Sequence, residues 1–150
     1  RLKEKIDEGK HIRNNIKLRG TKEESLTISK LVNKGPRIIF FINKNACRSC
    51  IEDIIKIVIR ILEKSPDLKD KVVFITNFEE DRYFLSFYKT LKINIPTYNL
   101  NNYGIEFKID NQPFFFVLDS TYKTKMVFIP DRHDPKITLK YLGSVSERFY

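Results

Sequence analysis

Two short, uninterrupted apolar runs with an amphipathic segment between them constrain the fold of this chain more than any other feature. The runs are Ile38–Ile42 (IIFFI) and Val72–Ile75 (VVFI), and both are rich in β-branched and aromatic residues. Such runs are typical of strands buried on both faces of a sheet. Between them, Cys47 to Lys64 carries apolar residues at i, i+3, i+4 and i+7 spacing, which predicts a helix. A strand, a helix and a strand in this order predict a right-handed βαβ unit with parallel strands.

The other predicted elements complete a single α/β domain with helices on both faces of a central mixed sheet. They are an N-terminal hairpin over Ile16–Ile28, a helical turn over Ser29–Asn33, a helix over Asp81–Leu91, two hairpin strands over Phe114–Leu118 and Lys125–Ile129, and a helix over Pro135–Tyr150. The stretch Ile93–Asp110 is predicted as irregular, with a short strand at Ile105–Phe107 as an alternative. The asparagines and the glycine at positions 99 to 104 suit a strand poorly.

The composition agrees with one folded domain. A chain of 150 residues with 41% hydrophobic residues, 5 Gly and 6 Pro can bury a core without disulfides and is neither disordered nor collagen-like. No apolar run approaches the roughly 18 residues that a membrane span requires. With only two His and two Cys, the sequence excludes large His- and Cys-based metal clusters.

The net charge of +9 is concentrated at the start of the chain, where residues 1–37 hold 11 Lys and Arg against 5 Asp and Glu. Residues 1–15 are predicted as a basic stem or as a helix closed by Gly9, ahead of a domain over residues 16–150. Because the chain opens at Arg1 and not at Met, we expect a processed protein with a membrane anchor upstream. We expect no nucleic-acid partner, because the basic stretch carries neither interleaved aromatics nor a binding motif.

The two cysteines form a Cys47-Arg48-Ser49-Cys50 motif at the start of the predicted long helix. At i, i+3 in a first helical turn the two sulfurs lie on one face, close enough for a disulfide. Free backbone N–H groups and the helix dipole favour a thiolate at Cys47, and Arg48 adds positive charge beside it. Cys50, one turn further in, is expected to be the more buried thiol.

Three interpretations of this motif remain open from the residues alone. A C-x-x-C set in a βαβ pattern is typical of a redox-active dithiol. A metal carrier, for copper above all, would use the two thiols and His133, although the latter is more simply a solvated histidine in a turn. A structural disulfide would close a very short loop and so stabilise the fold little.

With these elements in place, the sequence from Ile16 to the end resembles the thioredoxin-fold superfamily, and more closely its extracytoplasmic TlpA/ResA-like branch. The resemblance rests on the Cys47–Cys50 motif, on the N-terminal hairpin and on Gln112-Pro113 ahead of the apolar run Phe114–Leu118. It implies a cis peptide bond at Pro113, packing of this proline against the cysteines, and pairing of a substrate strand with the backbone of Gln112. Pro96 is the rival for this place.

The sequence departs from the family at two positions, has neither Pro nor an aromatic residue between the cysteines, and differs from peroxiredoxins at a further position. Ala46 replaces the usual Trp before the first cysteine, and Phe41 falls near the position of the buried acid of ordinary thioredoxins. Lys44, three residues before Cys47, replaces the Thr or Ser that peroxiredoxins need, which disfavours that class.

The resemblance and the motif together predict a thiol–disulfide oxidoreductase. Cys47 would attack and Cys50 would resolve, with no organic cofactor and no bound metal. The expected partners are protein thiols or disulfides and a membrane-bound or soluble redox protein, outside the cytoplasm and most simply in a periplasm. A thioredoxin-fold copper carrier and a non-catalytic binding module are the alternatives.

Overall fold

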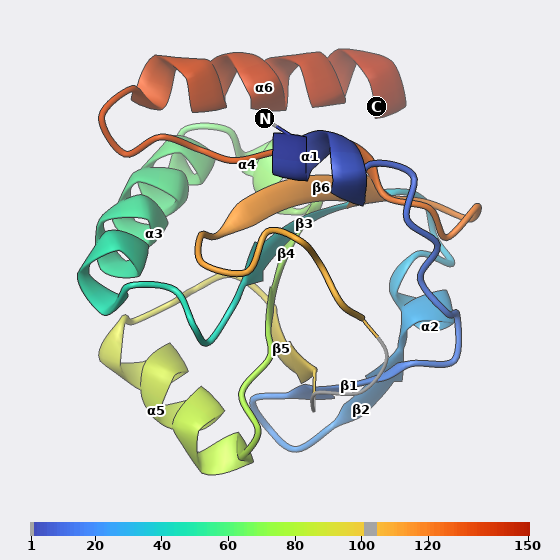
Figure 1. The fold of residues 1–150 in the computed structure, drawn as a ribbon, viewed down its shortest axis with the longest axis vertical. Coiled ribbons are helices and arrows are strands. Elements are labelled where there is room, and N and C mark those ends of the chain that lie inside the picture. Colours follow the sequence, from blue (N-terminus) through green and yellow to red (C-terminus); the bar gives the residue numbers. More distant parts are fainter. Residues whose placement is uncertain (1, 101–104) are drawn as a thin grey trace.

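A seven-stranded mixed sheet runs through the computed structural model, which describes residues 2–100 and 105–150 (Figure 1). Its strands lie in the order β2-β1-β5-β4-β3-β6-β7. The strands are β1 (Lys17–Gly20), β2 (Ser25–Thr27), β3 (Arg37–Ile42), β4 (Val72–Thr76), β5 (Thr97–Leu100), β6 (Phe114–Leu118) and β7 (Lys125–Phe128). The N-terminal hairpin, both buried runs and the C-terminal hairpin lie where the sequence predicts them.

The pairing of the central strands confirms the predicted βαβ unit. β3 pairs in parallel with β4, with Ile38 opposite Val72 and Ile42 opposite Thr76. β6 runs antiparallel to β3, and β7 runs antiparallel to β6. β3 therefore lies inside the sheet, and its apolar side chains are covered on both faces, as its uninterrupted apolar run predicts.

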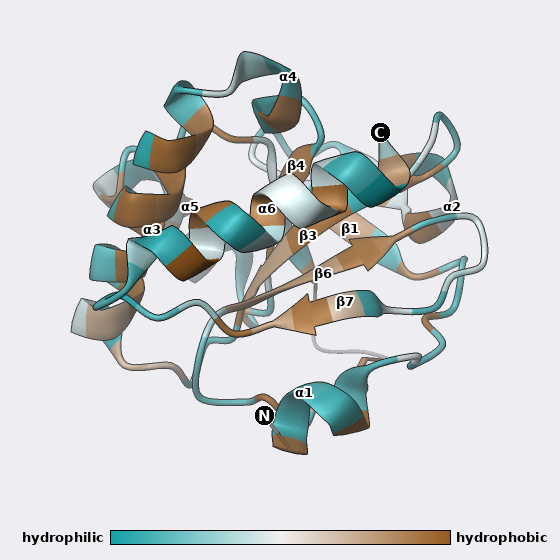
Figure 2. Ribbon diagram, turned by 90° about the horizontal axis from the view of Figure 1, so that it is seen from above, coloured by the Kyte–Doolittle hydropathy of each residue, from teal (hydrophilic) through white to brown (hydrophobic). Residues whose placement is uncertain are grey.

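Helices cover both faces of this sheet. They are α1 (Leu2–Asp7), α2 (Ile28–Leu31), α3 (Arg48–Glu63), α4 (Pro66–Lys69), α5 (Asp81–Thr90) and α6 (Pro135–Phe149). Successive side chains of β3 point alternately into two hydrophobic cores, one on each face of the sheet. One core joins the sheet to the apolar sides of α3, α5 and α6, and the other packs it against α2 and the irregular segments before β1 and β6. Figure 2 shows α6 lying across β3 and β6, with α1 beside β7 at the edge of the sheet.

The prediction of an irregular segment after Ile93 is wrong over Thr97–Leu100, which form β5 between β1 and β4. The polar side chain that argued against a strand, Asn99, is fully buried and bonded there. Its Oδ1 accepts hydrogen bonds from Thr76 Oγ1 and the Phe78 backbone N–H, each at 2.8 Å. These partners are distant in sequence, so local propensity could not reveal them. No strand forms at 105–107, and residues 101–104 lie outside the described residues.

The N-terminal residues contain a helix that contacts the sheet. The buried Asp7 carboxylate accepts hydrogen bonds from the backbone N–H groups of Lys108 and Ile109, both at 2.9 Å. Glu8 accepts hydrogen bonds from two backbone N–H groups of the edge strand β7, at 3.0 and 2.9 Å.

Within the described residues, no helix is both long enough and apolar enough to span a membrane.

Candidate active site

The strand order brings four loops to the same end of the sheet. β3 and β4 are parallel, so the loops that follow them lie at the same end. β6 is antiparallel to β3 and begins at this end, and β7 is antiparallel to β6 and finishes there. The residues after β3, after β4, before β6 and after β7 therefore meet at this end. This is where open α/β sheets commonly bind their ligands.

Two asparagines shape the loop that presents the first cysteine. Asn43 is nearly buried, and its Oδ1 accepts a hydrogen bond from the Asn45 backbone N–H at 2.9 Å. Asn77, after β4, accepts a hydrogen bond from the Lys44 backbone N–H at 2.7 Å. The Lys44 ammonium also pairs with Glu79 at 2.7 Å. These contacts fix the chain between the end of β3 and the start of α3, and the sequence analysis singled out neither asparagine.

The two cysteines occupy the first turn of α3, as predicted. Cys47 is the N-cap residue, and Cys50 lies three residues further on. Both thiols are free; Cys47 is exposed and Cys50 is half-buried. The Cys47 Sγ also lies 3.3 Å from the Ser49 Oγ. The expected difference in burial between the two thiols is therefore present.

Hydrogen bonding makes the two thiols chemically unequal. The pKa of Cys47 is lowered to about 7, first by the hydrogen bond from the Cys50 thiol, then by the Ser49 hydroxyl and by the Cys50 backbone N–H. The same thiol–thiol hydrogen bond, together with burial and the Cys47 charge, raises the pKa of Cys50. One interaction thus favours the thiolate at Cys47 and the protonated thiol at Cys50.

Arg48, expected to assist the Cys47 thiolate, makes its contacts elsewhere. Its Nε donates a hydrogen bond to Glu52 at 3.2 Å, and its guanidinium lies 5.7 Å from the ring centroid of Phe87. The arginine whose charge lowers the pKa of Cys50 is Arg132, which follows β7.

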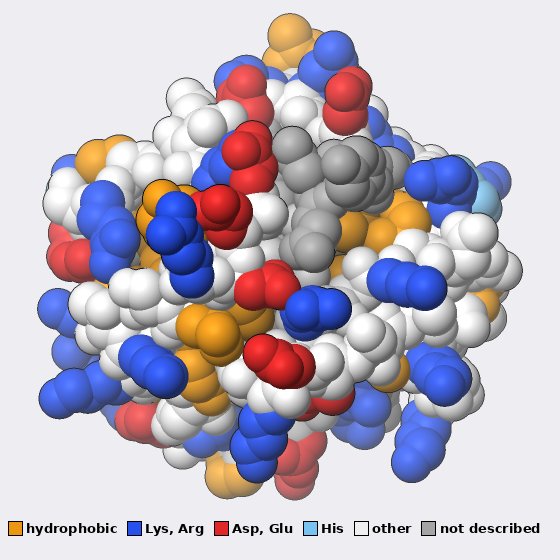
Figure 3. Space-filling model, turned by 90° about the horizontal axis from the view of Figure 1, so that it is seen from below, with side chains coloured by type: hydrophobic (Ala, Val, Ile, Leu, Met, Phe, Trp, Pro, Cys, Tyr) orange, Lys and Arg blue, Asp and Glu red, His pale blue; other side chains and the backbone are white. Residues whose placement is uncertain are grey.

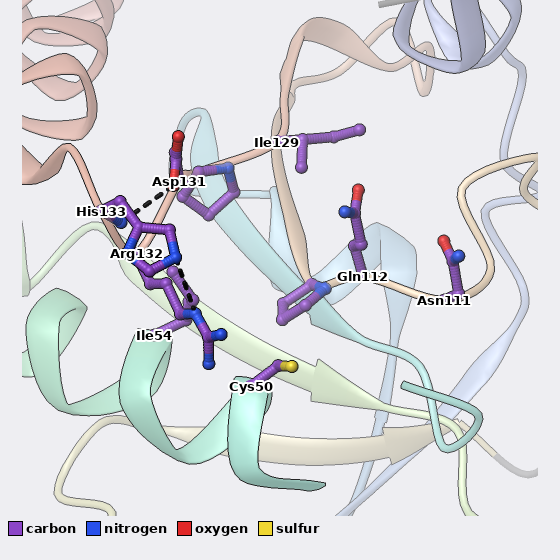
Figure 4. A pocket seen from close by; sticks show the side chains of 10 residues that line it. Cys50, Ile54, Asn111, Gln112, Ile129, Asp131, Arg132 and His133 are labelled. Carbon is purple, nitrogen blue, oxygen red and sulfur yellow. Dashed lines mark hydrogen bonds between the residues drawn. The ribbon is translucent and has the colours of Figure 1, made fainter. Parts of the chain in front are cut away.

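A pocket of about 540 Å³ opens beside Cys50 (Figure 4). Its lining comes from three places in the chain: Cys50 and Ile54 of α3, Asn111–Pro113 ahead of β6, and Ile129–His133 after β7. The structure thus brings Gln112 and Pro113 together with Cys50, as the resemblance implies. Pro96 lines a different pocket, together with residues of α2 and β4.

The expected cis peptide bond at Pro113 is wrong. No peptide bond among the described residues is cis, and this includes the bond between Gln112 and Pro113. The expectation came from the family resemblance alone, whereas an X-Pro bond intrinsically favours the trans form by roughly 0.5–1 kcal/mol. Pro113 is nevertheless buried at the pocket, while Gln112 is exposed at its rim.

Arg132 and His133 are the site residues that the sequence analysis missed or set aside. His133 is exposed in a turn before α6, as expected, but it also lines the pocket that contains Cys50. The predicted hairpin does not by itself indicate this, because its second strand ends beside the end of β3 only when β6 pairs antiparallel with β3.

Phe41 lies at the position where the resemblance places a buried acid, and its surroundings are apolar. Its ring contacts those of Phe107 and Phe114, with centroids 5.1 and 5.5 Å away.

Across residues 2–100 and 105–150, no group of three or more His, Cys, Asp or Glu side chains is arranged to hold a metal ion.

Comparisons by sequence identify no relative: no family model matches the chain, and no curated protein does. Solved structures are similar in fold. A protein of Aquifex aeolicus that is assigned to electron transfer by its name has a TM-score of 0.65 at 15% identity, over 90% of this chain and 92% of that one. A protein assigned as the thiol:disulfide interchange protein DsbE of Chlorobium tepidum has a TM-score of 0.66 at 12% identity, over 92% and 96%. The peroxidoxin BcpB of Mycobacterium tuberculosis has a TM-score of 0.57 at 13% identity, over 93% and 97%.

These similarities establish the fold. The chain has a thioredoxin-like α/β fold with one central mixed sheet, as the sequence predicts. At 12–15% identity the similar structures do not establish a common activity.

Proposed function

We propose that this protein is a thiol–disulfide oxidoreductase in which Cys47 attacks and Cys50 resolves. The observation that carries the proposal is the placement of two free thiols at the start of α3, with Cys47 exposed at the N-cap and Cys50 half-buried three residues further on. With a pKa of about 7, Cys47 is partly thiolate at neutral pH and is exposed, so it can reach a substrate disulfide. Cys50 stays protonated and does not compete for the substrate.

The reaction has two exchange steps. The Cys47 thiolate attacks one sulfur of a substrate disulfide and forms a mixed disulfide, and the other substrate sulfur leaves as a thiolate and takes up a proton. Cys50 then loses its proton and attacks Cys47 Sγ. This forms the Cys47–Cys50 disulfide and releases the second substrate thiol. The protein dithiol is oxidised by two electrons and the substrate disulfide is reduced by two; the reverse sequence oxidises a dithiol.

The pocket next to Cys50 supports a protein or peptide substrate. Gln112 is exposed at its rim, and its backbone lies just ahead of β6, where an extended segment could pair with it. Pro113 forms part of its floor. We propose these two residues as the substrate-binding pair, and protein thiols or disulfides together with a redox protein as the partners.

We further propose that the chain acts outside the cytoplasm, as a member of the TlpA/ResA-like branch. This proposal is supported by the sequence resemblance and by the similarity in fold to the C. tepidum protein assigned as DsbE. Fractionation of cells that express the full-length product tests this part, and recovery of an unprocessed protein in the cytoplasm would contradict it.

A trapping experiment tests the proposed reaction. The reduced C50S variant is mixed with a fluorescent peptide that carries one intramolecular disulfide, and the products are separated on a non-reducing gel. We expect a reductant-sensitive adduct with C50S, because Cys47 attacks and nothing resolves the mixed disulfide. The C47S and doubly substituted variants serve as controls and should form little or no adduct.

Two results would reject this assignment. Equal adducts with C47S and C50S would show that the thiols have no division of labour. No adduct with either variant, combined with Cu(I) binding by the wild type that C47S abolishes, would favour a copper carrier.

A further inference from the structure

Arg132 is held beside the resolving cysteine by contacts at two of its nitrogens. Its Nη1 donates a hydrogen bond to Asp53 Oδ2 at 3.2 Å, and its Nε donates to His133 Nε2 at 3.3 Å. Asp53 lies on α3 one turn after Cys50, so this ion pair connects the loop after β7 to the active-site end of the helix. Figure 4 shows the guanidinium extending from this loop toward α3, between Ile54 and Cys50.

The charged and titratable groups around the pocket have unequal effects on Cys50. Asp53 is on α3, and Asp131, Arg132 and His133 are on the loop after β7. Asp53 is occupied by the ion pair with Arg132, and Asp131 accepts the backbone N–H of His133 at 2.8 Å. Charge on Cys47 raises the pKa of Cys50, and the charge of Arg132 lowers it.

The balance changes when Cys47 enters a mixed disulfide. Cys47 then carries no charge, and the thiol–thiolate hydrogen bond that held the Cys50 proton is lost. Burial still disfavours a Cys50 thiolate, and the charge of Arg132 still favours it. Stabilisation of the thiolate by a neighbouring cation is a route to a reactive Cys50 in the second step, and Arg132 is the cation that lines this pocket.

We propose that Arg132 is a positioning residue for the resolving step: it stabilises the Cys50 thiolate that attacks the mixed disulfide on Cys47. This role rests on the proposed oxidoreductase function. In this step Cys50 releases its proton to solvent, the Cys47–Cys50 bond forms, and the bond from Cys47 to the substrate sulfur breaks. The departing substrate thiolate takes up a proton. Asp53 and His133 keep the guanidinium near the sulfur.

The first experiment measures Cys50 alone, in the C47S background, which also lacks the Cys47 thiolate. Iodoacetamide alkylation rates are measured from pH 6 to 10 for C47S and for C47S with R132Q, R132K or R60Q added. R132Q should move the profile to higher pH and slow alkylation at pH 7.5 about threefold to fivefold, because a nearby positive charge is lost. R132K should restore part of the rate. R60Q, which removes an exposed arginine two to three turns further along α3, should leave the profile unchanged.

The second experiment follows resolution in the protein with both cysteines. Decay of the mixed disulfide with the fluorescent peptide should be slower in R132Q at pH 7 and should recover toward the wild-type rate at pH 9, where Cys50 ionises without assistance. A purely structural defect would not recover with pH.

The two proposals fail in different ways. If C50S traps the peptide but R132Q leaves both the alkylation profile and the decay unchanged, Arg132 has no such role and the oxidoreductase proposal stands. If R132Q shifts the alkylation profile but C50S traps nothing, Arg132 stabilises the thiolate but the resolving role and the proposed function are both rejected.

Discussion

At the scale of single residues, the interaction between the two thiols is the first cause of the difference in their pKa values. The Cys50 thiol donates to the Cys47 sulfur and thereby lowers the pKa of Cys47 while raising its own. The backbone N–H of Cys50 lowers the pKa of Cys47 further. Ser49 contributes a third donor through its hydroxyl, 3.3 Å from Cys47 Sγ. Ser49, which lies between the two cysteines, therefore stabilises the Cys47 thiolate.

This contact predicts that Ser49→Ala raises the pKa of Cys47. Loss of the hydroxyl donor destabilises the thiolate but leaves the thiol unaffected, so less of Cys47 is ionised at pH 7. Arg48→Gln should raise this pKa by less, because the Arg48 guanidinium is already paired with Glu52. The thiolate absorbance near 240 nm, followed against pH in the C50S background, measures both changes. A larger effect of Arg48→Gln would restore Arg48 as the main tuning residue.

At the scale of elements, α1 is bound to the rest of the fold through carboxylates that accept backbone N–H groups. Asp7 satisfies two N–H groups of the segment before β6, and Glu8 satisfies two at the exposed edge of β7. An uncovered edge strand is a site of unwanted pairing with other chains. The contact therefore both stabilises the sheet and protects its edge, and it adjoins the strand that leads to Arg132.

The burial of Asp7 predicts that Asp7→Ala lowers the free energy of unfolding by about 3 kcal/mol. The substitution leaves two N–H groups without an acceptor, and that of Ile109 is buried. The matched control is Asp110→Ala, because Asp110 forms an exposed ion pair with Lys3 at 3.6 Å and should matter by less than about 1 kcal/mol. Urea unfolding of both variants measures the difference. Equal, small losses would show that α1 contributes little to stability.

The elements also show which parts of the structure the sequence could predict. β3, β4 and β6 are fully or almost fully buried, so unbroken apolar runs identify them, and the periodicity of α3 is equally plain. β5 escaped prediction because its buried Asn99 is satisfied by groups around position 76 to 78, more than twenty residues away. The cysteines follow from a local motif. Arg132 reaches the site only through the order of strands β3, β6 and β7, which no local pattern specifies.

At the scale of the whole molecule, the basic residues on the face drawn in Figure 3 do not form one continuous patch. Figure 3 shows Lys and Arg side chains interspersed with Asp and Glu over the face seen from below. The sheet order concentrates function in a different way, since it gathers the ends of four strands around one dithiol. The oxidation state of that dithiol is therefore linked to the stability of the whole domain, because the native structure shifts the pKa of both thiols away from their unfolded values.

This linkage predicts that the reduced protein gains stability relative to the oxidised protein as the pH rises from 6 to 8. The native pKa of Cys47 is about 7, below the roughly 8.5 of an unfolded thiol. Below pH 6 the Cys47 thiol is protonated in both the native and the unfolded state of the reduced protein, so it contributes nothing to the free energy of unfolding. Above pH 7 the native thiol ionises first, so unfolding requires proton uptake and stability rises with pH. The raised pKa of Cys50 acts in the opposite sense, but only as the pH approaches and passes about 8.5.

Urea unfolding of the reduced and the oxidised protein at pH 6, 7 and 8 measures this effect, and the difference between the two curves should move steadily in favour of the reduced form. The double variant C47S/C50S, with and without reductant, controls for effects of the reductant itself and should show no difference at any pH. A constant difference between reduced and oxidised wild type would mean that the Cys47 thiolate is not stabilised by the fold. In that case the asymmetry between the thiols, and with it the assignment of attacking and resolving roles, would lose its physical basis.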